Sequence, residues 1–302
     1  MTQAQPLKVM LADDEPLARG YLEDLLKAMP DIEVLGSFKN GSEVLKACRD
    51  NPPDVLILDI EMPVMDGLTL LAEKRKMGDS TPVMMLSSLT QAGAAVTMQA
   101  LEAGAIEFVP KPAGDVGIRL EDLENQIELK VAGLVHSLME QEARSRQVVG
   151  PRLRAGEHSF KMALIGASTG GPQSLQTVFS HLPGDFPVPL VVVQHMPPIF
   201  TAAFAQRLDR VSGLQVFEAE EGMRMQPGQA YVAPGGKHLD FRRKGDGITL
   251  HLDSESPAHN AHKPSVDFTL HKAVDLLDGE ILAVIMTGMG RDGVEALVRL
   301  HD

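Results

Sequence analysis

Cysteine, aromatic residues and long apolar runs are scarce in this chain of 302 residues. It contains one cysteine, Cys48, no tryptophan and two tyrosines. A single cysteine cannot form an internal disulfide, which excludes a disulfide-stabilised scaffold. No run reaches the roughly 18 to 20 apolar residues of a membrane helix, and no basic start followed by an apolar stretch marks a secretory signal. We therefore expect a cytoplasmic protein without direct membrane insertion.

Basic residues are also few. Lys and Arg number 28 against 41 Asp and Glu, which gives a net charge of -13. This balance argues against a nucleic-acid partner, because binding to phosphates needs a basic surface. A hydrophobic content of 44% with 23% charged residues is typical of a globular chain. At this length we expect about two domains, each with its own core.

The first part of the chain, up to about Ala113, alternates short apolar runs with segments of helical period. This alternation predicts an α/β domain whose parallel sheet is covered by helices on both faces. With the flavodoxin-like strand order 2-1-3-4-5, strands one and three are neighbours. The expected strands are residues 8–12, 33–38, 55–59, 83–87 and 106–109.

A second α/β alternation follows a polar stretch. Residues 120–142 have a helical pattern, and residues 144–158 have no apolar period, which indicates a linker. We expect strands at 162–165, 190–194, 230–232 and 281–286, helices that begin near Pro172, Ile199 and Ser265, and an irregular strand excursion at 227–252. The predicted domains are residues 1–125, a helix and linker at 126–158, and a doubly wound parallel-sheet domain at 159–302.

Charged residues follow the expected strands of the first domain. Asp13 and Asp14 follow strand one, Asp59 ends strand three, and Lys111 follows strand five. Parallel strands gather functional groups at their carboxyl ends, so these side chains should meet. Three neighbouring carboxylates repel one another unless a cation lies between them, and an all-oxygen cluster suits Mg²⁺. One carboxylate could then act as a nucleophile toward a phosphoryl group, with Lys111 compensating the added charge.

The first domain resembles a response-regulator receiver. The resemblance rests on MLADDE at 10–15, LILDIEMPVMDG at 56–67, LSS at 86–88 and FVPKP at 108–112. It implies that Asp59 is the phosphoacceptor and that Asp13, Asp14 and Asp59 hold Mg²⁺. It further implies that Ser87 contacts the phosphoryl group, that Lys111 pairs with it, and that Phe108 is the aromatic switch residue. A sensor histidine kinase is the implied phosphodonor.

The second domain begins with a glycine-rich turn, IGASTGGP at 165–172, which places Ser168 between a strand and a helix. This is the G-x-S-x-G pattern of a nucleophilic serine. The same kind of turn can hold a phosphate or dinucleotide, and the turn alone leaves both interpretations open. The chain lacks G-x-G-x-x-G spacing and the Lys-Ser/Thr pair of a nucleotide-triphosphate loop there.

Two further residues favour a serine hydrolase. His195 follows the strand at 190–194, and Asp292 follows a turn after the strand at 281–286. Ser168, His195 and Asp292 would supply a nucleophile, a general base and a carboxylate that orients the base. The chain order Ser, His, Asp differs from the order Ser, Asp, His of α/β-hydrolases, which predicts a different esterase fold.

The second domain resembles the catalytic domain of chemotaxis response-regulator methylesterases. The matching blocks are IGASTGGP, VQHMP at 193–197, VAPG at 232–235, HKPSVD at 262–267 and MTGMGRDG at 286–293. The resemblance implies hydrolysis of glutamyl methyl esters on methyl-accepting chemoreceptors, deamidation of receptor glutamines, and no cofactor for the esterase. Thr169 and Met289 would line the oxyanion site. The family usually continues beyond the matching Asp with a further strand and helix, so a shortened catalytic domain with weakened activity is expected.

Other interpretations compete with this one. His259 and His262 have the spacing of a metal pair, but no cysteine joins them. Lys237, Arg242 and their basic neighbours predict a solvated edge. A receiver-controlled docking protein with a degenerate esterase domain is the alternative function, which the complete Ser, His and Asp set disfavours.

Overall fold

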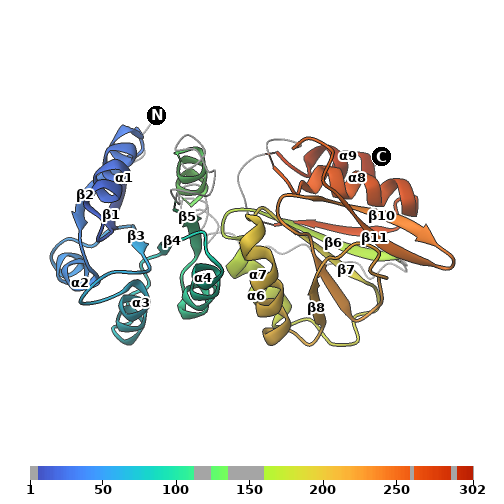
Figure 1. Cartoon of the computed structure of the whole chain (residues 1–302), viewed down its shortest axis with the longest axis horizontal. Coiled ribbons are helices and arrows are strands. Elements are labelled where there is room, and N and C mark those ends of the chain that lie inside the picture. Colours follow the sequence, from blue (N-terminus) through green and yellow to red (C-terminus); the bar gives the residue numbers. More distant parts are fainter. Residues whose placement is uncertain (1–5, 112–123, 135–159, 259–261, 287–290, 302) are drawn as a thin grey trace, which may run out of the picture. The chain divides into compact units, whose positions relative to one another are not determined.

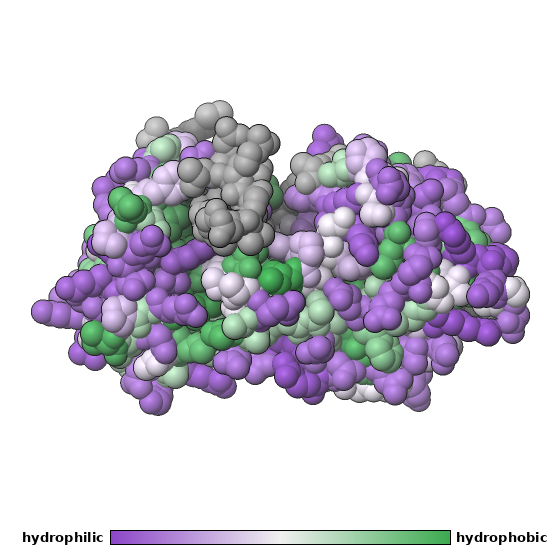
Figure 2. Space-filling view, in the orientation of Figure 1, coloured by the Kyte–Doolittle hydropathy of each residue, from purple (hydrophilic) through white to green (hydrophobic). Residues whose placement is uncertain are grey.

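The computed structural model describes residues 6–111, 124–134, 160–258, 262–286 and 291–301. Contacts divide the chain into two compact units between residues 135 and 136. The predicted linker at 144–158 lies outside the described residues. None of the described helices is long and apolar enough to cross a membrane. Hydrophilic side chains cover much of the visible surface of each unit (Figure 2).

The N-terminal unit is built on a five-stranded parallel sheet of order β2-β1-β3-β4-β5, which confirms the predicted order. Helices α1 and 124–134 lie on one side of this sheet, and α2, α3 and α4 lie on the other (Figure 1). The strands are β1 (Leu7–Ala12), β2 (Ile32–Phe38), β3 (Val55–Asp59), β4 (Val83–Ser87) and β5 (Glu107–Pro110). The labelled helices are α1 (Pro16–Ala28), α2 (Gly41–Asp50), α3 (Gly67–Lys76) and α4 (Gln91–Ala103).

Burial explains why these strands form. Every residue of β3, β4 and β5 is buried, as a sheet covered on both faces requires. The helices begin at well-defined caps: the Asn40 side chain accepts from the Glu43 N–H, Asp66 from Thr69 and Thr90 from Gly93. Burial therefore accounts for the strands, and the caps mark where three of the helices begin.

The C-terminal unit has a second five-stranded parallel sheet, of order β12-β6-β7-β9-β8, and an antiparallel hairpin of β10 and β11. Helices α8 and α9 lie on one side of β6 and β7, and α6 and α7 lie on the other (Figure 1). The strands are β6 (Met162–Ala167), β7 (Leu190–Gln194), β8 (Gln215–Glu218), β9 (Gln229–Val232), β10 (His238–Lys244), β11 (Gly247–Asp253) and β12 (Ile281–Ile285). The helices are α6 (Gly171–Phe179), α7 (Pro198–Val211), α8 (Val266–Leu277) and α9 (Val294–His301).

Two features differ from the sequence-based expectation. Strand β8 was not predicted, because only Val216 of its four residues is fully buried and the strand has no apolar run. It lies at the edge of the sheet and pairs with β9 alone. The irregular excursion at 227–252 contains β9 and the regular β10–β11 hairpin.

Candidate phosphoacceptor and active sites

Strand register assembles the acidic cluster of the N-terminal unit. Ala12 of β1 pairs with Leu58 of β3, so Asp13 and Asp59 leave neighbouring strands at the same level. β4 and β5 also pair with each other, and directly after β5 the Lys111 N–H donates to the carbonyl of Ser87, the last residue of β4, at 2.6 Å. The strand ends thus bring together the residues that the sequence predicted to meet.

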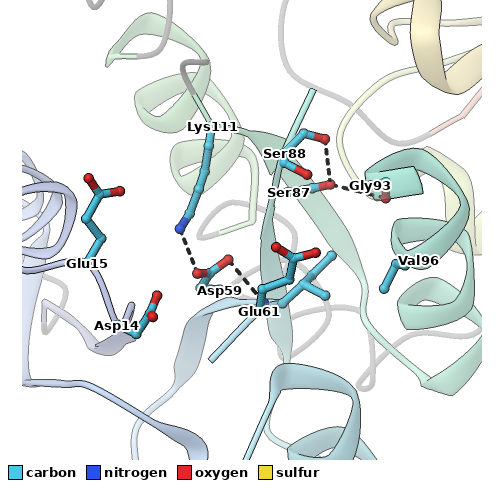
Figure 3. A pocket seen from close by; sticks show the side chains of 10 residues that line it. Asp14, Glu15, Asp59, Glu61, Ser87, Ser88, Gly93, Val96 and Lys111 are labelled. Carbon is cyan, nitrogen blue, oxygen red and sulfur yellow. Dashed lines mark hydrogen bonds and ion pairs between the residues drawn. The ribbon is translucent and has the colours of Figure 1, made fainter. Parts of the chain in front are cut away.

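Lys111 bridges two of the three carboxylates. Its Nζ lies 2.6 Å from Asp13 Oδ2 and 2.7 Å from Asp59 Oδ2, and Figure 3 shows the ammonium group pointing at Asp59. Burial raises the pKa of Asp59 to about 6, although the hydrogen bond and charge of Lys111 pull it down. Burial alone would lower the pKa of Lys111, but hydrogen bonds to Asp13 and Asp59 raise it. One ammonium group therefore compensates these buried carboxylates incompletely.

The cluster fits a hard divalent cation. One carboxylate oxygen from each of Asp13, Asp14 and Asp59 lies within 4.8 Å of the others. Oxygen donors of this kind suit Mg²⁺, which also accepts phosphate oxygens. The adjacent pocket has a volume of about 260 Å³ and is lined by Asp59, Ser87 and Lys111 among others. There is room beside the carboxylates for a phosphoryl group.

Two other predicted residues are held by neighbours. Ser87 Oγ lies 2.5 Å from Thr97 Oγ1, and Thr97 donates to the Gly93 carbonyl at 2.7 Å. Phe108 is buried, and Lys130 Nζ lies 4.8 Å from its ring centroid. Lys130 also donates to the Phe108 carbonyl at 2.5 Å and to Glu107 at 2.9 Å. The aromatic residue is therefore tied to helix 124–134, a contact that the sequence did not predict.

In the C-terminal unit, the register of β6 and β7 places the serine beside the histidine. Ala167 pairs with Gln194, and the His195 N–H donates to the Ala167 carbonyl at 3.2 Å. Ser168 and His195 are the residues that directly follow the two strands. The Gln194 side chain donates to the Ser168 carbonyl at 3.0 Å and so supports the turn.

Glycines allow this turn to be tight. Gly170 has φ of 73°, the left-handed conformation that favours glycine, and it is the N-cap residue directly before α6. A Cβ atom at Gly171 would lie 2.0 Å from Gln194 Oε1. A larger residue at position 171 would therefore displace Gln194 from the turn.

The three predicted residues form one hydrogen-bonded chain. His195 Nδ1 lies 3.1 Å from Ser168 Oγ, and His195 Nε2 lies 2.8 Å from Asp292 Oδ2. An ionised carboxylate only accepts hydrogen bonds, so Nε2 carries the proton and Nδ1 is free to accept from the serine hydroxyl. The side chains of His195 and Asp292 are 10% and 3% exposed, which limits competition from water.

Asp292 is held by the beginning of α8. Its Oδ1 accepts from Ser265 Oγ at 2.7 Å and from the Asp267 N–H at 2.9 Å, and its Oδ2 accepts from the Val266 N–H at 2.7 Å. Burial alone would raise the pKa of Asp292, but the hydrogen bonds from His195, from the α8 N–H groups and from Ser265 hold it well below its usual range. A helix N-terminus stabilises a negative charge in this way.

Sequence reasoning missed Ser265 as a partner of the triad carboxylate. The available signal was its role as a helix cap: Ser265 Oγ accepts from the Phe268 N–H at 3.1 Å. Sequence alone does not say which anion occupies a helix N-terminus. Of the two residues predicted for the oxyanion site, Thr169 is buried beside Ser168, and Met289 lies outside the described residues.

A flavodoxin-like unit with a clustered Asp and Lys site, joined to a parallel-sheet unit with a Ser, His and Asp chain, defines a receiver-linked serine hydrolase. Comparisons with known proteins agree. Residues 9–121 match the model of the response regulator receiver domain, and residues 163–302 match that of CheB methylesterase.

Two relatives carry the same name, protein-glutamate methylesterase/protein-glutamine glutaminase. The protein from Halalkalibacterium halodurans is 40% identical over 97% of this chain and 85% of its own length, and that from Thermotoga maritima is 38% identical with the same coverage. The crystal structure of the Thermotoga maritima CheB methylesterase catalytic domain is 46% identical, covers 47% of this chain and 75% of that structure, and has a TM-score of 0.46. This chain belongs to the protein-glutamate methylesterase/protein-glutamine glutaminase family.

Proposed function

We propose that this chain removes methyl groups from glutamyl methyl esters of methyl-accepting chemoreceptors and that phosphorylation of Asp59 controls this reaction in chemotactic adaptation. The observation that carries the proposal is the hydrogen-bonded chain from Ser168 through His195 to Asp292. We propose that the chain acts in the cytoplasm.

Acylation begins at the serine. Ser168 Oγ attacks the ester carbonyl while its proton passes to His195 Nδ1. Asp292 stays ionised beside Nε2 and stabilises the imidazolium that forms, which agrees with its lowered pKa. As the tetrahedral intermediate collapses, the carbon–oxygen bond to methanol breaks and His195 returns the proton to the leaving group.

Hydrolysis of the acyl-enzyme completes the cycle. A water molecule gives its proton to His195, attacks the acyl carbonyl and releases a glutamate carboxylate together with the free Ser168 hydroxyl. We assign stabilisation of the oxyanion to Thr169 and Met289. Receptor glutamines would follow the same route with ammonia as the leaving group, so one site accounts for both methylesterase and glutaminase activity.

In the N-terminal unit we assign phosphoryl transfer to Asp59. An Asp59 oxygen attacks the phosphorus of a phosphorylated histidine on a sensor kinase, the phosphorus–nitrogen bond breaks, and an aspartyl phosphate forms. Asp13, Asp14 and Asp59 would hold Mg²⁺, which neutralises charge on the transferred group. We assign pairing with the phosphoryl oxygens to Lys111, which contacts Asp59, and donation to these oxygens to Ser87, which lines the same pocket.

Active-site labelling tests the esterase assignment. A fluorophosphonate should label Ser168 in the whole chain, whereas Ser168→Ala should be unlabelled and should release almost no methanol from methylated receptor. His195→Ala should lose nearly as much activity, and the double variant should be hardly worse, because the triad acts as a unit. An unlabelled Ser168 in the parent chain would instead favour the non-enzymatic docking protein.

A further inference from the structure

The flat face of the proposed base is covered by a second histidine. The ring of His262 stacks on that of His195 with a centroid separation of 3.8 Å and an interplanar angle of 14°. The sequence gave His262 as the first residue of the block HKPSVD, without a role, and as half of a weak metal pair with His259, a residue outside the described part of the chain. The stacking contact gives His262 a different place, at the centre of the site.

The hydrogen bonds of His195 leave one rotation unrestrained. Both contacts, from Nδ1 to Ser168 and from Nε2 to Asp292, are made by nitrogens at the edge of the ring. The ring can still turn about the line that joins these two contacts, and the χ2 torsion of histidine has a broad minimum. A planar group against the ring face opposes this rotation, because tilting would break the stack or cause a clash.

The segment that carries His262 is itself anchored. The next residue, Lys263, donates from Nζ to the carbonyls of Ser254 at 2.7 Å and Ser256 at 2.6 Å, and its carbonyl accepts from the Gly236 N–H at 2.9 Å. Just beyond, the Ser265 N–H donates to His238 Nδ1 at 3.2 Å. His262 is therefore presented from a braced segment and can act as a fixed surface.

The charge state of His262 suits this position. Burial, followed by the charge of His195, lowers the pKa of His262 to about 4, although Asp292 opposes the shift. The ring is thus neutral near pH 7. A neutral aromatic face tolerates an imidazolium stacked on it, whereas a second cation would oppose proton transfer to His195.

We propose that His262 is a positioning residue whose ring fixes the plane of His195, so that Nδ1 stays directed at the Ser168 hydroxyl before and after proton transfer. This inference rests on the proposed function of the triad. It concerns the geometry of the base and involves no contact between His262 and the ester.

Three single substitutions of His262, each made in the full-length chain, distinguish a role as a planar surface from a role as simple space filling. His262→Ala removes the surface, His262→Leu keeps bulk without a plane, and His262→Phe keeps a flat ring that cannot titrate. His251→Ala, at a half-buried position on the β10–β11 hairpin where the ring contacts Glu221, is the matched histidine control. For each variant, kcat and KM for methanol release, the rate of fluorophosphonate labelling and the melting temperature are measured.

We expect His262→Ala to lower kcat and the labelling rate together, on the order of tenfold to a hundredfold, with little change in KM. His262→Leu should resemble His262→Ala, while His262→Phe should recover most of the rate. If His262→Ala melts far below the parent chain, the comparison of His262→Phe with His262→Leu decides, since both fill the site.

Unchanged kcat in His262→Ala, equal losses in His262→Phe and His262→Leu, or a change confined to KM would overturn the positioning role. These outcomes leave labelling of Ser168 in the parent chain intact and so leave the proposed function standing. Failure to label Ser168 in the parent chain would remove the proposed function and the positioning role together.

Discussion

Each unit buries a functional aspartate, Asp59 at the end of β3 and Asp292 in the turn after β12, and these two carboxyls have opposite pKa shifts. Burial raises the pKa of Asp59 to about 6, whereas hydrogen bonds outweigh burial at Asp292 and hold its pKa low. Asp59 shares one ammonium group with Asp13. Asp292 receives two backbone N–H groups, a hydroxyl and an imidazole N–H.

The difference matches the two proposed tasks. A carboxylate that must attack phosphorus needs lone pairs that are not all occupied by hydrogen bonds. The protein therefore gives it few donors, and its negative charge is fully compensated only when a cation binds. A carboxylate that must stay ionised beside an imidazolium needs permanent donors, because it should never take the proton itself. Local donor number, and not burial, therefore decides what each buried aspartate can do.

Removing the charge at Asp292 should have the largest effect. We expect Asp292→Asn to lower kcat for methanol release by about a thousandfold or more, because an amide cannot hold the required tautomer of His195 or stabilise its charged form. Asp275→Asn, on the same helix α8 and paired with Arg299 at the surface, is the control and should be nearly normal. Similar rates in both variants would show that Asp292 is not the orienting carboxylate.

Asp59 should behave in the opposite sense. Without Mg²⁺, Asp59→Asn should raise the free energy of unfolding of the N-terminal unit by about 1 to 3 kcal/mol at pH 7.5, because it removes a carboxyl whose ionised form is disfavoured on folding. Since the folded pKa is raised, the penalty of the parent chain grows as the pH rises from about 4 through 6, so the advantage of the variant shrinks on acidification. Amide hydrogen exchange of residues 55–59, compared between parent and variant at several pH values, measures this difference in the free energy of unfolding.

The same variant has a second readout. Asp59→Asn should accept no phosphate from acetyl phosphate, while basal methanol release stays unchanged, because the nucleophilic oxygen alone is lost. Added Mg²⁺ should stabilise the parent chain more than the variant, which would close the gap between them. Stable phosphate incorporation into the variant, or a penalty at pH 7.5 that Mg²⁺ does not relieve, would contradict the assignment of Asp59.

A substitution at Ser265 removes one hydrogen bond to Asp292 and leaves its charge in place, so we expect a smaller effect than that of Asp292→Asn. Ser265→Ala removes one of the four donors and also the cap of α8, which should cost about 1 kcal/mol of stability and raise the pKa of Asp292 modestly. We expect methanol release to fall by about tenfold to a hundredfold, since each hydrogen bond to a charged group contributes roughly 1.5 to 3 kcal/mol and about 1.4 kcal/mol corresponds to a factor of ten in rate. Thr90→Ala removes a comparable cap from α4 in the other unit. It should lower stability without reducing basal release, and an equal loss of activity would argue against a special role for Ser265.

Much of the fold could be predicted because local pattern and burial agree. The run Val55–Asp59 is buried throughout, and its bounds coincide with those expected from its apolar residues. Strand β8 could not be found in this way, since its two apolar residues lie between Gln215 and Glu218 and the strand is largely exposed at a sheet edge. Pairing with β9 stabilises it, and that pairing joins separate segments.

The sequence by itself determined the two α/β units, the strand ends that carry Asp13, Asp59, Ser168 and His195, and the glycines that make the serine turn, because these depend on local periodicity and backbone freedom. Only the tertiary structure decided the partners of those residues. The α8 N-terminus that holds Asp292 and the ring of His262 against His195 come from segments distant in sequence. No local pattern encodes these contacts, because they arise when the packed sheet brings separate loops to one edge.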